Sequence, residues 1–412
     1  MQKAVAYKSF VYQPIMYRAM IRQTTRAYLA WVCISIIFTA FNATAAPLTA
    51  SSTNASNELV IGQVASLSGT NGADLGLGLK LGIETYFKHI NAQGGVNGRK
   101  LRLISKDDQY KPEETVRLTT ELIASDAPLA LIGYRGTANT LALIKSNVLV
   151  SSNTPLIGTL SGATEIQGAT LIYHARTSYR DEITQLVYQL QRLSMTKVGV
   201  LYADDAFGKS GLDAVTVALA SSKQQAVKVA VYDKAADKVE ASIKQAAAML
   251  AEARPQAVIM VAVGDPVYAF VKEMRRVGPT TQLYGISVVN PDAVVEKAGL
   301  EAARGIGFSQ VFPYPYAEGV GLVREYRALL KAYSPNAHPA YFSLEGFVYA
   351  KLLVEAIRRA GPKVTRQKLI DSLDKLPAID FGGFPIKMNS ETHNGSQFTE
   401  LAIIGKTGRL LR

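Results

Sequence analysis

The sequence has one cysteine and four histidines, and these shortages exclude several kinds of site. Cys33 lies within an apolar segment near the N-terminus, so the rest of the chain can form neither a disulfide nor a cysteine-based metal site. The histidines, His89, His174, His338 and His393, are scattered along the chain and do not form a ligand cluster. We therefore expect no metal and no cofactor.

Sequence motifs for catalysis are also missing. The chain has no Gly-x-Ser-x-Gly elbow, no Walker sequence and no Gly-x-Gly-x-x-Gly after its first expected strand. Asp107-Asp108 and Asp204-Asp205 follow expected strands and would suit acid–base chemistry. At such positions, however, helix caps and ion pairs are the commoner roles. We expect no catalytic residue, and a binding role is favoured over an enzyme.

The charge of the chain is basic but not concentrated. Lysines and arginines outnumber acids by 12, and five of these cations lie in the first 26 residues. The remaining 40 basic and 33 acidic residues are interspersed. A nucleic-acid-binding protein would present a basic face with interleaved aromatic residues, so we expect no nucleic-acid partner.

The N-terminus has the pattern of a secretory signal. Residues 1–26 are basic without an acid, Ala27–Phe41 is apolar, and Ala43-Thr44-Ala45 matches a cleavage site. We expect a signal peptide over 1–45, a flexible polar lead-in over 46–57, and a periplasmic location. The alternative, an uncleaved membrane anchor, is disfavoured because the apolar segment falls short of the ~20 residues that span a bilayer.

Beyond residue 57, short apolar segments alternate with amphipathic helical patterns. This alternation predicts an α/β fold with parallel sheets covered by helices on both faces. The predicted strands are Leu59–Val64, Leu101–Ser105, Leu129–Gly133, Pro155–Gly158, Val198–Tyr202, Val227–Tyr232, Ala257–Val263, Leu283–Ile286 and Gly305–Val311.

One segment, residues 90–112, has a well-defined local pattern. Apolar residues at helical spacing end near Asn91, and Gly94-Gly95 can take the positive φ that stops a helix. Asn97-Gly98 is typical of a tight turn, and a strand follows. Pro112 suits the first turn of the next helix.

Several short motifs, in this order and spacing, resemble one family. They are Ser68-Gly69, Gly94–Gly98, Asp107-Asp108 with Pro112, Ala175-Arg176-Thr177 with Asp181, Asp205–Gly208, Leu344–Phe347, Ala356 with Arg359-Ala360-Gly361, Gly382-Gly383-Phe384, and His393 with Gly395-Ser396. The chain resembles the type I periplasmic binding proteins, in the branched-chain amino acid (Leu/Ile/Val) subgroup.

The resemblance implies two Rossmann-like lobes joined by three hinge crossovers that close on a ligand. The first lobe would hold residues 58–175 and 308–378, and the second 176–307 and 379–412. Such a protein captures a small-molecule ligand and delivers it to the permease of an ABC importer in the inner membrane. We expect it to act as a monomer.

Ligands of open α/β sheets bind beyond the carboxyl ends of strands, and small hydroxylated residues are frequent there in this chain. In amino-acid-binding relatives, a hydroxyl after the third strand and a small-residue segment after the fourth hold the ligand's carboxylate and amino groups. The resemblance places these at Thr137 and at Leu160-Ser161-Gly162, and it places an aromatic at Phe207, where relatives often have tyrosine. The positions of a family tyrosine and of the acid that pairs with a ligand ammonium correspond to Gly264 and Ser287. Asp265 could replace the acid, or cap the helix that follows.

Basic and aromatic residues distinguish this chain from its amino-acid-binding relatives. Arg135 precedes Gly136 and Thr137 in the third loop, Tyr179 and Arg180 lie at a lobe crossover, and Tyr110 follows the acidic pair. The guanidinium groups suit a carboxylate, but lobe-to-lobe or surface ion pairs would account for them equally.

The predicted binding residues are Arg135, Gly136, Thr137, Leu160, Ser161, Gly162, Tyr179, Phe207, Gly264 and Ser287. We expect the ligand to be a small organic acid or amide, including an aromatic one, rather than zwitterionic leucine. The alternatives are a ligand-sensing module of the same fold and, less favoured, an α/β enzyme.

Overall fold

The computed structural model describes residues 57–69, 72–235, 237–389 and 391–412. The predicted signal peptide and the lead-in up to residue 56 lie outside this part of the chain. Within the described residues, no helix combines the length and the apolar character needed to cross a bilayer.

The first lobe is built on a five-stranded sheet with the order β2-β1-β3-β4-β5, and all its strand pairs are parallel. Its strands are β1 (Glu58–Ala65), β2 (Lys100–Asp107), β3 (Ala130–Arg135), β4 (Leu156–Leu160) and β5 (Ile172–Tyr173). Its helices are α1 (Ala73–Ala92), α2 (Pro112–Asp126), α3 (Thr137–Lys145), α4 (Val148–Ser151), the short 3-10 helix η1 (Thr164–Ile166), α11 (Gly321–Tyr333), α12 (Tyr341–Ala360) and α13 (Arg366–Asp374).

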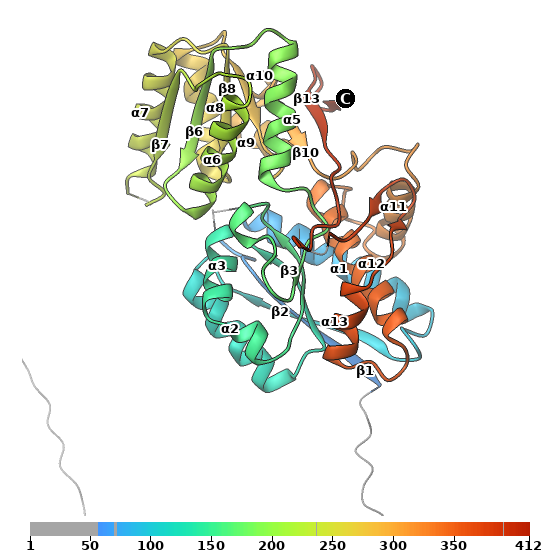
Figure 1. The fold of residues 1–412 in the computed structure, drawn as a ribbon. Helices are drawn as coiled ribbons and strands as arrows, with labels where there is room; N and C mark the ends of the chain where they lie inside the picture. Colours follow the sequence, from blue (N-terminus) through green and yellow to red (C-terminus); the bar gives the residue numbers. More distant parts are fainter. Residues whose placement is uncertain (1–56, 70–71, 236, 390) are drawn as a thin grey trace, which may run out of the picture. The chain divides into compact units, whose positions relative to one another are not determined.

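Helices cover both faces of this sheet, as Figure 1 shows. Successive strand residues point to opposite faces, so Leu131 packs in the core beneath α2 and α3, while Ile132 packs in the core beneath α1 and α12. Helices α1 and α12 cross closely. A Cβ on Gly82 would lie 1.9 Å from the Ser343 carbonyl oxygen, so this crossing requires glycine.

The second lobe is built on a seven-stranded sheet with the order β14-β13-β10-β9-β8-β6-β7. Its strands are β6 (Val198–Ala203), β7 (Lys228–Tyr232), β8 (Ala257–Val261), β9 (Gln282–Gly285), β10 (Gly307–Gln310), β13 (Glu400–Ile404) and β14 (Leu410–Leu411). Its helices are α5 (Tyr179–Arg192), α6 (Ala206–Ala220), α7 (Val239–Glu252), α8 (Asp265–Val277), α9 (Pro291–Ala298) and α10 (Leu300–Ala303). Strands β13 and β14 pair antiparallel with their neighbours.

The chain passes between the two groups of elements three times. It leaves β5 for α5, returns from β10 to α11, and leaves α13 again for β13. The third passage carries a two-stranded hairpin, β11 (Ile379–Asp380) with β12 (Pro385–Ile386).

All nine predicted strands are present, with ends that differ by a few residues. The segment over residues 90–112 also has its predicted structure: α1 ends at Ala92, and Gly94 and Gly95 have φ values of 94° and 85°. A Cβ on Gly95 would lie 2.1 Å from the Arg99 carbonyl oxygen, so this turn tolerates only glycine. The predicted α/β fold with helix-covered, mainly parallel sheets is therefore confirmed, and the antiparallel strands β13 and β14 are an addition to the second sheet that was not predicted.

Candidate functional site

A small cavity lies where the carboxyl ends of strands from both sheets meet. It is lined by Leu75, Tyr110, Arg135, Gly136, Thr137, Leu160, Tyr179, Phe207, Val263 and Val288. The first lobe contributes the loops after β2, β3 and β4, and the second contributes the start of α6 and the residues after β8 and β9. Six of the ten residues predicted from the sequence line it.

The cavity is almost filled by its own side chains. The space open to the centre of a water molecule is about 10 Å³, which is room for roughly one water. The two lobes also touch beside it: the Asn290 side-chain amide donates to Asp74 (2.7 Å), and the Ser210 hydroxyl donates to Glu165 (2.7 Å). The conformation is closed, and a ligand requires these walls to move apart.

Among the described residues that line the cavity, Arg135 is the only charged one, and it is 2% exposed. Its guanidinium carbon lies 4.3 Å from the centroid of the Tyr110 ring, a cation–π arrangement. A Cβ on Gly72 would lie 2.7 Å from Arg135 Nη2, so the backbone approaches the guanidinium closely at that glycine. Burial lowers the pKa of Arg135 and raises that of the Tyr110 hydroxyl.

Two hydroxyl groups were predicted to bind the ligand, those of Thr137 and Ser161, and in the structure they contact each other. Thr137 Oγ1 and Ser161 Oγ are 2.7 Å apart, and both side chains are buried. Gly162 lies behind them, where its carbonyl accepts from the Tyr179 amide at 2.7 Å. A Cβ on Gly162 would come within 2.7 Å of that nitrogen, so this glycine shapes the wall without lining the cavity.

Two aromatic side chains, Tyr179 and Phe207, form the wall of the cavity on the side of the second lobe. The rings of Tyr179 and Phe207 meet edge to face with centroids 5.7 Å apart. Phe207 is positioned by the start of α6, where Asp205 accepts a hydrogen bond from the Gly208 amide. Gly264 precedes α8 with φ 73°, and it is Val263 beside it that lines the cavity.

Ser287 points into a buried polar network and does not line the cavity; Val288 does. The Ser287 hydroxyl accepts a hydrogen bond from Arg176 and donates one to Glu182 at 2.8 Å. Glu182 also accepts from the Ser309 hydroxyl. The Ser287 hydroxyl therefore already has hydrogen-bond partners within the protein.

The same network contains two buried carboxylates and one buried guanidinium. Arg176 Nη1 lies 3.7 Å from Glu345, whose carboxylate accepts from the Tyr349 hydroxyl. Burial raises the pKa of both Glu182 and Glu345, and Arg176 opposes that rise. Arg176 and Glu345 both lie in motifs of the family pattern, whereas Glu182 did not stand out in the sequence.

The acidic pairs serve structural roles, in agreement with the sequence interpretation. Asp107 accepts from the Leu67 amide and the Ser68 hydroxyl. Asp108 accepts from the Tyr110 amide and from Thr115 at the start of α2. These bonds hold the turn that presents Tyr110 to the cavity.

The other charged residues considered from the sequence either form ion pairs within the protein or lie outside the cavity. Asp204 pairs with Lys209 at 3.1 Å, and Asp205 pairs with Lys234. The interpretation of Asp265 as a helix cap was wrong, because Asp265 is the first residue of α8 and pairs with Lys297 at 3.1 Å. Arg180 is exposed and does not line the cavity.

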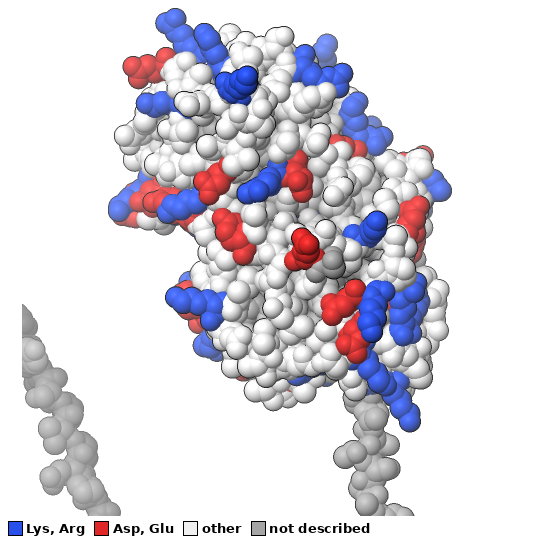
Figure 2. All heavy atoms as spheres, viewed as in Figure 1, with Lys and Arg blue, Asp and Glu red and all other residues white. Residues whose placement is uncertain are grey.

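The described residues contain no group of histidines, cysteines and acids arranged to hold a metal ion. On the face seen in Figure 2, blue lysine and arginine side chains predominate at the top of the view, and red acidic ones are interspersed with blue ones in its middle and lower parts. No single-sign stripe stands out on that face.

Comparison with known proteins agrees with this architecture. The family model described as "Periplasmic binding protein" matches residues 58–408. A substrate-binding periplasmic protein from Ralstonia solanacearum is 33% identical, and its crystal structure superposes with a TM-score of 0.81 over 86% of this chain and 99% of that chain. A possible leucine/isoleucine/valine-binding protein from Rhodopirellula baltica is 25% identical, with a TM-score of 0.78 over 88% of this chain and 98% of that chain.

Among curated proteins, an amino acid binding protein from Pseudomonas aeruginosa is 28% identical over 173 residues. That stretch is 41% of this chain and 45% of the relative, so the match spans less than half of the curated protein's length. The family match extends over residues 58–408, and the likeness to the Ralstonia structure covers 86% of this chain, so both reach well beyond this partial alignment. The chain belongs to the periplasmic binding protein family, and it resembles the Leu/Ile/Val-binding members of that family.

Proposed function

We propose that this protein captures a small organic solute in the cavity between its lobes and delivers it to an ABC importer, without chemical change to the solute. The observation that supports this most strongly is the cavity itself, which draws its walls from strand ends of both sheets. Membership of the family implies an extracytoplasmic location. The signal peptide over 1–45, release into the periplasm, the permease partner and a monomeric state complete the proposal.

The lining favours an anionic or neutral ligand over a zwitterion. Arg135 supplies a buried guanidinium that interacts with Asp74 and Asp108, and among the described residues that line the cavity there is no aspartate or glutamate. A ligand carboxylate would pair with Arg135, whereas an ammonium buried without a counter-charge costs several kcal/mol. We therefore propose a small carboxylate or amide as the ligand, although the Pseudomonas relative is named for amino acid binding.

Binding would proceed by hinge opening. The lobes, 58–175 with 308–378 and 176–307 with 379–412, would part at the three crossovers and break the Asn290–Asp74 and Ser210–Glu165 contacts. A ligand would then take the space between Arg135 and the Thr137–Ser161 hydroxyls. Tyr179 and Phe207 would cover its apolar side.

Of the ten predicted residues, we assign direct ligand contacts to the six that line the cavity. Ser161, Gly162 and Gly264 support that lining, since Ser161 bonds to Thr137, Gly162 to Tyr179, and Gly264 adjoins Val263. Ser287 would act through the Arg176–Glu182 network.

Native mass spectrometry of the protein purified from its own host tests this proposal. We expect a co-purified small acid or amide whose mass is unchanged after prolonged incubation with the protein. Turnover of that solute, or retention of leucine as the only ligand, would overturn the proposal.

A further inference from the structure

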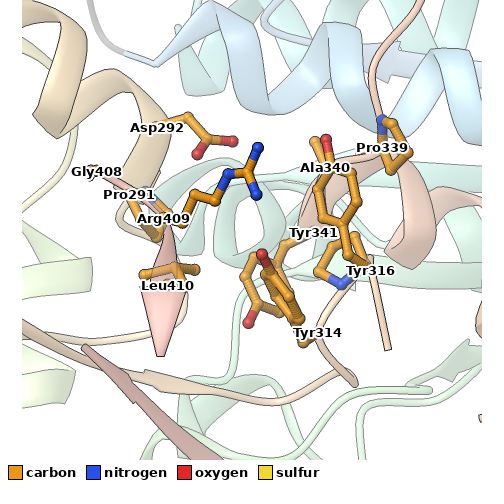
Figure 3. A pocket seen from close by; sticks show the side chains of 11 residues that line it. Pro291, Asp292, Tyr314, Tyr316, Pro339, Ala340, Tyr341, Gly408, Arg409 and Leu410 are labelled. Atoms are coloured by element: carbon orange, nitrogen blue, oxygen red, sulfur yellow. The ribbon is translucent and has the colours of Figure 1, made fainter. Parts of the chain in front are cut away.

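A second, larger cavity lies apart from the first and shares no residue with it. The space in it open to the centre of a water molecule is about 340 Å³, which falls within the ~300–1,000 Å³ typical of small-molecule sites. Figure 3 shows the side chains that surround it. The lining residues that decide its chemistry are Asp292, Tyr314, Tyr316, Tyr341 and Arg409.

Three tyrosine rings form its apolar wall. The Tyr314 centroid lies 5.5 Å from that of Tyr316 and 6.3 Å from that of Tyr341. Tyr341 begins α12, is 7% exposed, and its hydroxyl donates to Glu400 at 3.4 Å. This wall is therefore anchored in the fold and offers flat surfaces suited to an apolar or aromatic group.

Two opposite charges face the cavity from the second lobe. Asp292 lies in the first turn of α9 and Arg409 immediately precedes β14, and Figure 3 shows their charged groups turned toward the same space. Within the described part of the chain, no oppositely charged group lies within 4.0 Å of either side chain, and neither side chain makes a hydrogen bond.

Two neighbouring arginines, unlike Arg409, form ion pairs within the protein. Arg412 lies over the Tyr314 ring and pairs with Glu400 at 3.9 Å. Arg327 lies over the Tyr316 ring and pairs with Glu318 at 2.9 Å. Tyr314 and Tyr316 thus each lie near a cation that is already paired, whereas Asp292 and Arg409 are not paired with any group in the described part of the chain.

We propose that this cavity binds a free α-amino acid as a zwitterion. The ligand carboxylate pairs with Arg409, its ammonium pairs with Asp292, and its side chain packs on the three tyrosines. A ligand with one charge would satisfy only one of the two groups, whereas a zwitterion satisfies both. The site differs in chemistry from the first cavity, whose lining has a cation and no acid.

Isothermal titration with L-phenylalanine tests the proposal, because its ring suits the tyrosine wall. Arg409→Gln and Asp292→Asn should each weaken binding about tenfold or more, since each removes a charged hydrogen-bond partner. The matched controls are Arg254→Gln and Asp213→Asn, two exposed residues outside both cavities. They should bind L-phenylalanine as the wild type does.

A second probe isolates the ligand's own charges. L-Phenylalaninamide keeps the ammonium and the ring but lacks the carboxylate, so it should bind the wild type about tenfold more weakly. Its affinity should then be unchanged by Arg409→Gln. Absence of L-phenylalanine binding, equal binding by the Arg409 and Asp292 variants, or equal binding of the amide would each overturn the proposal.

Discussion

The guanidinium of Arg135 lies over the ring of Tyr110, 4.3 Å from its centroid, inside the cavity that joins the two lobes. Lys234 Nζ lies 5.4 Å from the centroid of the same ring and pairs with Asp205 of the second lobe. The Tyr110 ring is therefore within cation–π distance of one cation from each lobe. The pair supplies both the charge proposed to grip the ligand and part of the closed state's stability.

Replacement of Tyr110 separates the ring's contribution from that of its hydroxyl. We expect Tyr110→Leu to lower the free energy of unfolding by about 2 kcal/mol, because it removes the cation–π contacts and leaves a small void. Tyr110→Phe should be near neutral, since the ring remains. Urea denaturation of both variants measures this, and equal losses would contradict the role of the ring.

Opening of the lobes should govern ligand association. Ser210→Ala removes the hydroxyl that donates to Glu165 across the lobes, so the open form becomes more populated. We expect faster association in stopped-flow measurements, by a few-fold. Ser221→Ala, whose hydroxyl bonds only within the second lobe, is the matched control. Slower association in the Ser210 variant would contradict this mechanism.

The buried network at the first crossover should be sensitive to loss of its cation. Arg176→Met leaves Glu182 and Glu345 without their counter-charge, and we expect a loss of about 3–5 kcal/mol in the free energy of unfolding. Much of that loss should be recovered in the triple variant that also carries Glu182→Gln and Glu345→Gln. Denaturation of the two proteins side by side checks this, and equal stability of both would disprove the electrostatic explanation.

The close crossing of α1 and α12 gives a packing prediction. Gly82→Ala places a methyl group 1.9 Å from the Ser343 carbonyl oxygen, so the helices must separate. We expect a loss of about 2–4 kcal/mol, measured by thermal or urea unfolding. Gly319→Ala, where a Cβ meets nothing within 4 Å, should be near neutral. A Gly82 variant as stable as this control would show that the crossing adapts.

His174 predicts a specific pH dependence of stability. Burial lowers the pKa of its imidazole from 6.5 to about 4. Between these values the unfolded chain gains a proton that the folded protein does not, so the free energy of unfolding falls as the pH falls through this window. The loss is up to about 3 kcal/mol. Above the window the imidazole is neutral in both states, so its titration no longer changes the free energy of unfolding.

His174→Gln tests this contribution. The variant should be less stable at neutral pH but should lose less stability than the wild type between pH 6.5 and pH 4. Chemical denaturation across that range measures both slopes. Parallel slopes would show that His174 titrates normally in the folded protein.

The sequence predicted the central strands well because buried parallel strands are short apolar segments with few alternatives. It missed β5, β11, β12, β13 and β14. Strand β5 has only two residues, and β13 alternates buried Ala402 and Ile404 with exposed Ile403 at the sheet margin. Their pairing is decided by contacts with residues distant in the chain.

The sequence predicted which loops form the site, because these loops follow the ends of predicted strands. Loops such as Arg135-Gly136-Thr137 lie at the cavity because parallel strands end at one edge of a sheet. Side-chain direction is a different matter: Ser287 turns toward Glu182, 105 residues away in sequence, and leaves Val288 to line the cavity. No local pattern contains that information.

The central claim is that Arg135 makes this a site for small carboxylates. Isothermal titration of benzoate, acetate and leucine into the wild type, Arg135→Gln and the exposed control Arg180→Gln tests it most directly, with circular dichroism to confirm folding. We predict that a carboxylate binds the wild type and Arg180→Gln equally, and Arg135→Gln at least about tenfold more weakly. Leucine binding that excludes carboxylates and is unaffected by a folded Arg135→Gln variant would contradict the claim.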